Sequence, residues 1–208
     1  MKRIGMLLML SAVLALGSCV HEAAAPFGAT SFTPAYYEVG SPPPSVPQCA
    51  GIGTVTVDDK RPDPLLVGER FHEEHPADKF AIKSTSAPAA WVQAGIVEAL
   101  KKATMPVSGA GKGNVVATIA AINLEEKAAW NAMYRAKVVL DVVVTKPGSA
   151  EACWTGRVEG VSENYGEAAK SENYAETMNH ALDRALTTLM VEKGFLDGTC
   201  GACAAAKP

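Results

Sequence analysis

Two short motifs in this 208-residue chain combine residue types that could do chemistry. The first, Cys200-Gly201-Ala202-Cys203, has the C-x-x-C spacing of dithiol redox sites. A reactive pair of this kind needs a low thiol pKa, which a helix N-terminus or nearby cations provide. Here the motif follows the C-terminus of a predicted helix and lies close to the end of the chain. We therefore favour a structural role for both thiols, with thiol–disulfide exchange by Cys200 and Cys203 as the alternative.

The second motif, His72-Glu73-Glu74-His75, could supply metal ligands. A zincin requires H-E-x-x-H, so that both imidazoles lie on one face of a helix. In this chain the two histidines are only three positions apart, and Pro76 follows at once. The spacing favours a solvated polar loop over a zinc site.

A cluster of carboxylates could in principle bind calcium through oxygen ligands. It consists of Asp58, Asp59 and Asp63, but Lys60 and Arg61 lie among them and the EF-hand spacing is absent. The sequence also lacks the G-x-S-x-G motif of hydrolases and the phosphate-binding loop of NTPases. We therefore predict no metal, no cofactor and no catalytic residues, and hence a protein that is not an enzyme.

The N-terminus has the parts of a secretory signal. Lys2 and Arg3 precede an apolar run from Ile4 to Leu16, which is too short for a permanent membrane helix. The run ends at Leu16-Gly17-Ser18-Cys19, which resembles the bacterial lipobox. The resemblance implies cleavage before Cys19, acylation of that cysteine with chains such as palmitate, and attachment to a membrane through the lipid. Val20, in place of an aspartate, favours the outer membrane and a domain that faces the periplasm.

The composition of the mature chain excludes one class of partner. Removal of Lys2 and Arg3 with the signal leaves 17 of the 19 basic residues against 22 acidic ones. Proteins that bind nucleic acid neutralise phosphates with clustered Lys and Arg, and the sequence has no such cluster. We predict no nucleic-acid partner.

Five cysteines are present, and the lipid would use one of them. An even number remains, which favours disulfides in an oxidising compartment. The expected strand directions bring all four to one end of the sheet. Four cysteines allow three connectivities. We favour two disulfides, in which Cys49 and Cys153 each bond one of the C-terminal pair, Cys200 and Cys203.

Hydrophobic periodicity predicts a single α+β domain with the order β-α-β-β-β-α. We expect an antiparallel sheet with two helices packed on one face, and a core that includes Val55, Val138, Leu140 and Trp154. Residues 65–85 are ambiguous, with a short strand over Phe80–Lys83 as one option. The expected strands lie near 52–57, 114–124, 133–145 and 152–161, and the expected helices near 88–104 and 172–193.

The sequence divides into a signal peptide (1–18), a lipidated and proline-rich linker (19–48), a periplasmic domain (49–203) and a short tail (204–208). One polar stripe of the domain is expected to be a solvated sheet face or, alternatively, a surface on which a partner docks. Its members are Arg135, Lys137, Asp141, Arg157 and Glu159.

The order of elements behind a lipobox and a proline-rich linker resembles the YajG-like group of proteobacterial outer-membrane lipoproteins. The residues that carry the resemblance are Gly53–Arg61, Leu66-Val67-Gly68 and the two helices around the later strands. The resemblance implies a location and a fold, and it carries over no catalytic residues.

Taken together, these patterns predict a non-enzymatic lipoprotein that acts as an accessory or adaptor of an envelope process. It would contact an envelope protein through the sheet face or through residues 58–85. The alternatives are the thiol–disulfide protein already described and a binder of a lipid or glycan fragment between helices and sheet.

Overall fold

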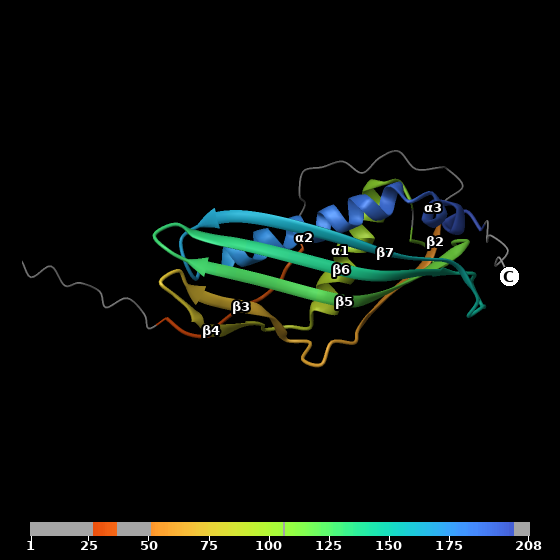
Figure 1. Ribbon diagram of the computed structural model, residues 1–208. Helices are drawn as coiled ribbons and strands as arrows, with labels where there is room; N and C mark the ends of the chain where they lie inside the picture. The colour runs from red at the N-terminus through yellow and green to blue at the C-terminus, as the bar shows by residue number, and fades with distance from the viewer. Residues whose placement is uncertain (1–26, 37–50, 106, 202–208) are drawn as a thin grey trace, which may run out of the picture.

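A computed structural model of the chain describes residues 27–36, 51–105 and 107–201 (Figure 1). They form an α+β fold with one mixed sheet and three helices. The strands are β1 (Thr30–Phe32), β2 (Ile52–Asp59), β3 (Leu66–His72), β4 (His75–Ser84), β5 (Gly113–Ala128), β6 (Ala132–Thr145) and β7 (Ala152–Gly166). The helices are α1 (Pro88–Lys102), α2 (Ser171–Val191) and α3 (Lys193–Thr199).

The sheet has the strand order β1-β4-β3-β5-β6-β7, and β2 also pairs with β5. The predicted meander of β5, β6 and β7 is antiparallel, as expected. The expectation of a wholly antiparallel sheet was wrong, because β2 and β3 both run parallel to β5. The reason is that α1 is a crossover helix between β2 and β5, and a crossover of this kind joins parallel strands.

The ambiguous segment 65–85 forms a β-hairpin from β3 and β4. β2 pairs with the first half of β5 and β3 with its second half, so that the two strands flank β5 one after the other. β3 and β4 are antiparallel, so the hairpin adds no net displacement along the sheet. α1 therefore still leads the chain back to the start of β5. The directions of β5, β6, β7 and α2 are therefore those that the sequence predicted.

Part of the predicted linker belongs to the folded domain. Residues Thr30–Phe32 form β1 and pair in parallel with β4. Phe32 is buried and its ring lies 5.5 Å from that of Tyr174, while its carbonyl accepts a hydrogen bond from Thr85 N at 2.9 Å. The burial of this aromatic ring explains why a strand forms within the proline-rich segment.

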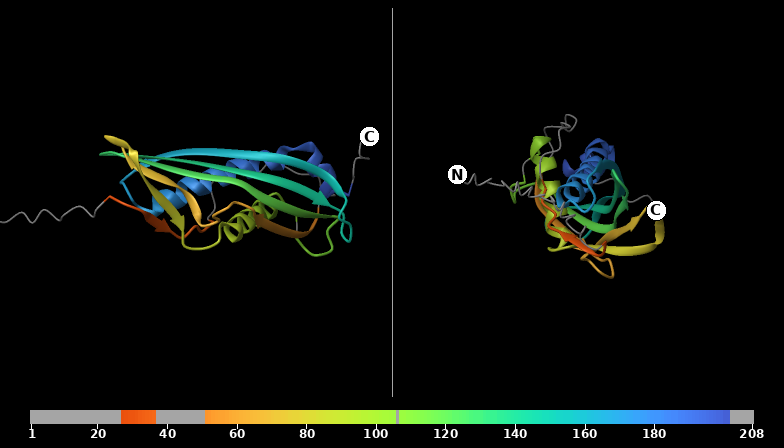
Figure 2. Two further views of the ribbon diagram at one scale, coloured as in Figure 1. Left: turned by 60° about the horizontal axis from the view of Figure 1, so that its bottom comes forward. Right: turned by 90° about the vertical axis from the view of Figure 1, so that its left-hand side faces the viewer.

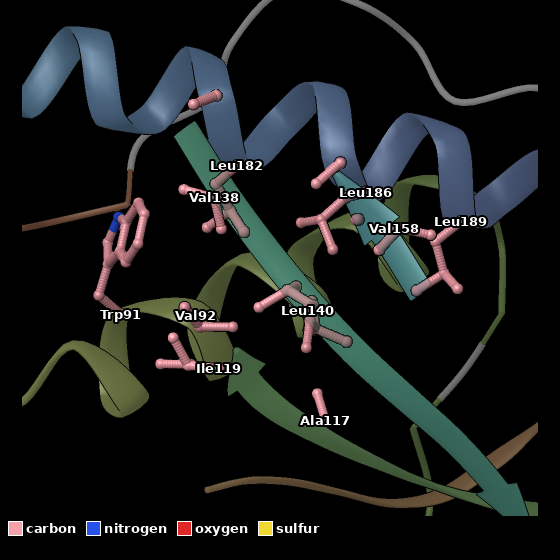
Figure 3. Packing of buried hydrophobic residues seen from close by; sticks show 14 of the residues in the cluster. Trp91, Val92, Ala117, Ile119, Val138, Leu140, Val158, Leu182, Leu186 and Leu189 are labelled. Atoms are coloured by element: carbon pink, nitrogen blue, oxygen red, sulfur yellow. The ribbon is translucent and has the colours of Figure 1, made fainter. Parts of the chain in front are cut away.

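Both long helices lie on the same face of the sheet, as predicted (Figure 2). Side chains from α1 and α2 point into one core against β5, β6 and β7 (Figure 3). α2 approaches β7 so closely that a Cβ on Gly160 would lie 1.9 Å from the carbonyl oxygen of Ala181. The labelled core residues are Trp91, Val92, Ala117, Ile119, Val138, Leu140, Val158, Leu182, Leu186 and Leu189.

The end of the last long helix differs from the prediction. α2 ends at Val191, Glu192 is extended, and the short α3 follows, with Gly194 inside it. A Cβ on Gly194 would lie 2.4 Å from the indole of Trp154. The glycine is therefore needed for the close packing of α3 against Trp154.

Candidate functional site

Of the predicted cysteine sites, Cys19, Cys49 and Cys203 lie outside the described residues. Cys153 is the second residue of β7, and Cys200 is the C-cap of α3 and packs partly buried against the core. The predicted position of the C-x-x-C motif at a helix C-terminus is therefore confirmed for its first cysteine. The negative end of the helix dipole lies there, which does not favour a thiolate.

The regions around the cysteines meet at one end of the sheet, which we call the cysteine pole (Gly51, Cys153 and Thr199–Cys200). Gly51 N donates a hydrogen bond to Thr199 O at 3.3 Å. Trp154 packs against Phe195 of α3, with the ring centroids 5.7 Å apart. This convergence is what the predicted framework requires, and the bonds themselves remain a prediction.

The His72–His75 segment is a tight β-hairpin turn and not the loop that the sequence suggested. His72 and His75 are paired across β3 and β4, and Glu73-Glu74 form the turn. The ring centroids of the two histidines are 6.1 Å apart, and His72 Nδ1 accepts a hydrogen bond from Glu74 N at 3.2 Å. Within the described ranges, no three His, Cys, Asp or Glu residues are grouped so that they could hold a metal ion.

Two of the three aspartates considered as calcium ligands have other partners. Arg61 donates to both carboxylate oxygens of Asp59, at 2.9 and 2.7 Å, and also to the carbonyls of Pro64 and Leu66. Asp63 accepts a hydrogen bond from Leu65 N at 3.1 Å. Arg61 thus fixes the bend between β2 and β3, and two of the three carboxylates stabilise local structure.

A buried ionic cluster that no sequence pattern predicted lies where β3, β5 and α2 meet. Glu126 is fully buried, and the Arg70 residue beside it is 5% exposed. Arg70 Nε lies 2.9 Å from Glu126 Oε2, and Arg70 Nη2 donates to Oε1 at 3.1 Å. The Tyr174 hydroxyl donates to Oε2, and Ala169 N donates to Oε1 at 3.0 Å. Both oxygens of this buried carboxylate are therefore held by protein donors.

The buried ionic cluster also holds the N-terminal segment. Arg70 Nη1 donates to Gly28 O at 3.3 Å, and the Arg70 guanidinium lies 4.1 Å from the centre of the Phe27 ring. Burial and the hydrogen bond to the Glu126 carboxylate raise the pKa of the Tyr174 phenol. The phenol therefore stays protonated at neutral pH and serves as a donor. In this arrangement both oxygens of the Glu126 carboxylate are occupied by protein donors.

The outer face of the sheet is solvated and its charges are paired across strands. Arg135 binds Glu163 at 2.8 Å, and Lys137 binds Glu159 at 2.7 Å. Arg157 contacts Asp141 at 2.6 Å, and its hydrogen bond lowers the pKa of the Asp141 carboxyl. The predicted polar stripe is thus confirmed as a sheet face. Its internal neutralisation gives a charged partner little to recognise.

A groove of about 440 Å³ opens where β2 ends and β3 begins. β2 pairs with β5 as far as Ile119, and β3 pairs from Leu124 onward. In the described pairings, residues 120–123 of β5 therefore pair with neither β2 nor β3. These four residues line the groove. Leu65 and Leu66 are each about two-fifths exposed at or beside its rim.

The space between α1 and α2 is much smaller. The hollow there holds about 10 Å³ and is lined by residues such as Tyr36, Ala99 and Leu186. That volume accommodates about one water molecule. This hollow lies between the two helices. The binding of a lipid or glycan fragment between helices and sheet remains a prediction.

No protein-family model and no curated protein matches the sequence. Among solved structures, a Xanthomonas campestris protein of family DUF330 matches with 8% identity and a TM-score of 0.48, covering 78% of this chain and 92% of its own. A protein from Caulobacter crescentus CB15, described provisionally as a lipoprotein, matches with 11% identity and a TM-score of 0.33, covering 65% and 90%. A third, described as uncharacterised, has 9% identity and a TM-score of 0.36, covering 76% and 94%. None of these descriptions names the YajG-like group, so that resemblance remains a prediction.

The described helices include none that is long and apolar enough to cross a membrane.

Proposed function

We propose that this chain is a lipoprotein of the bacterial outer membrane, anchored by acylated Cys19 and facing the periplasm. In this proposal it is a non-enzymatic accessory or adaptor of an envelope process. The observation that carries the non-enzymatic part is the buried ionic cluster. Its charged groups are bound to one another and to the backbone, as expected for a structural core.

We further propose that the adaptor function uses the groove between β2 and β3. An extended peptide segment of an envelope partner would add along β5 at residues 120–123, in the manner of β-strand addition. Main-chain hydrogen bonds to this short open edge would provide affinity, and the exposed leucines at Leu65 and Leu66 would contact apolar side chains of the partner. Arg61, which lines the groove and is held by its ion pair with Asp59, supports this choice over the self-neutralised outer face.

The lipid anchor predicts a large effect of one substitution. Cys19→Ala removes the thiol that accepts the lipid, so the protein should leave the membrane fraction or accumulate as an unprocessed precursor. Cell fractionation and immunoblotting against size standards measure both outcomes. Ser45→Ala is the control, because it changes a residue that lies outside both the lipobox and the predicted disulfides and should leave the membrane association unchanged. Normal size and normal membrane association of Cys19→Ala would refute the anchor.

A further inference from the structure

The turn between β5 and β6 presents a tryptophan to the outside. β5 ends at Ala128 and β6 begins at Ala132, and Trp130 in the middle of the turn is fully exposed. The other two tryptophans of the chain are packed: Trp91 is buried, and Trp154 lies against Phe195. A fully solvated indole at a hairpin tip contributes nothing to the core and needs another explanation.

The folded part of the chain begins at the same end of the sheet. The Phe27 ring lies 6.0 Å from that of His72, and His72 is in register with Ala128, two residues before Trp130. Glu73 N donates to Ala128 O at 2.9 Å, which ties the two hairpin tips together. Figures 1 and 2 both show that the first described residues, the β3–β4 turn and the β5–β6 turn lie at the same end of the sheet. We call this end, with Phe27, Glu73 and Trp130, the hairpin pole.

The length of the tether decides which pole faces the membrane. Cys19 and Phe27 are eight residues apart in the sequence. At about 3.3–3.6 Å per residue, they can be separated by at most roughly 29 Å. β5 has 16 residues and spans about 50 Å at about 3.3 Å per residue. A lipid on Cys19 therefore keeps the hairpin pole close to the bilayer, and the cysteine pole can lie much farther away.

We infer that Trp130 inserts into the headgroup region of the membrane that holds the Cys19 lipid. This inference rests on the proposed lipid anchor. In it, the partner of the hairpin pole is the surface of the bilayer. Tryptophan prefers the membrane–water interface, where its ring is partly apolar and its N–H can bond to headgroups or water. Lys127 pairs with Glu73 at 2.6 Å and so neutralises a carboxylate beside the turn. The indole gives the domain a second contact and sets its long axis upright on the membrane.

Quenching of tryptophan fluorescence by brominated phospholipids tests the inference. The mature lipoprotein is reconstituted in vesicles of phosphatidylethanolamine and phosphatidylglycerol, with and without bromine on the acyl chains. We expect the wild type to lose fluorescence on brominated lipid, and Trp130→Phe to show no such loss. In a matched control, Ser149→Trp in the Trp130→Phe background places an indole on the β6–β7 turn at the opposite pole. This variant should be quenched by aqueous iodide and not by brominated lipid.

A second anchor separates this inference from the proposed lipidation. The mature chain carries an N-terminal hexahistidine tag in place of the lipid and is bound to vesicles that contain a nickel-chelating lipid. Quenching that depends on Trp130 in this form supports the inference even if Cys19 carries no lipid in the cell. Equal quenching of the wild type and Trp130→Phe would overturn it. Quenching of Trp130 by iodide on both kinds of vesicle, with the lipidated and with the tagged protein, would also overturn it. That result is expected if the β5–β6 turn docks on a protein instead.

Discussion

Replacing Glu126 with Gln should lower the free energy of unfolding by about 3–5 kcal/mol, the cost of leaving a buried partner charge unpaired. Arg70 is almost fully buried and has Glu126 as its ionic partner. The amide retains the size of the side chain but not its charge, so the guanidinium is left uncompensated in the interior. Urea unfolding of the chain from residue 20, followed by circular dichroism, measures the change.

Asp141→Asn is the matched control for this prediction. It also breaks a carboxylate–arginine pair across two strands, but Asp141 and Arg157 are exposed to solvent. Exposed pairs contribute about 0–1 kcal/mol, so this variant should unfold near the wild-type midpoint. A paired replacement, Arg70→Met with Glu126→Leu, removes both charges and should recover part of the loss. Equal losses in Glu126→Gln and Asp141→Asn would contradict the account of the buried ionic cluster.

Loss of either predicted disulfide should cost about 2–5 kcal/mol, because each bond closes a long loop in the unfolded chain. Gly51, two residues after Cys49 in the sequence, donates a hydrogen bond to Thr199, the residue before Cys200. We therefore expect Cys49–Cys200 and Cys153–Cys203. Cys153→Ser and Cys203→Ser, alone or together, should then give nearly the same loss, since each breaks the same bond. Unfolding with and without reductant measures these values.

Peptide mapping under non-reducing conditions identifies the connectivity directly. A local Cys200–Cys203 link with unmodified Cys49 would contradict the framework and would favour the thiol–disulfide alternative. In that case an easily reduced pair should also appear in thiol titration of the native protein.

The sequence predicted the elements whose pattern is regular over a long stretch. Alternation of apolar and polar residues identified β6 and β7, and its outward positions carry the paired charges found there. The two long helices were predicted because their apolar positions recur at helical spacing. The strand directions alone predicted the cysteine pole, where the described residues Gly51, Cys153 and Cys200 lie.

The buried ionic cluster was missed because β5 changes its inward face midway. Val115, Ala117 and Ile119 point inward, but the register with β6 shifts between Ile119 and Ala121. Beyond this bulge the inward positions are Ile122, Leu124 and Glu126. An uninterrupted alternation would place Glu126 outside, and a one-residue shift moves it into the core. Its partner Arg70 lies 56 residues away in the sequence, so no local pattern connects them.

β1 and β3 were missed for a different reason, and β4 was predicted only in part, as an optional short strand over Phe80–Lys83. Their segments contain prolines and charges, which reduce strand propensity, and they form through pairing with distant strands. The groove at the break between β2 and β3 is a consequence of these pairings. It therefore could not be predicted from the sequence, although the segment 58–85 was named as a contact region.

Photo-cross-linking in intact cells tests the adaptor function most directly. A benzophenone amino acid is placed at Leu65, beside the groove, and at Thr155 on the outer face as the matched control. We predict one discrete adduct with an envelope protein from Leu65, its loss when Leu66→Glu is added, and no comparable adduct from Thr155. The absence of any adduct from Leu65, or the same adducts from both positions, would contradict the proposal that the groove binds a partner.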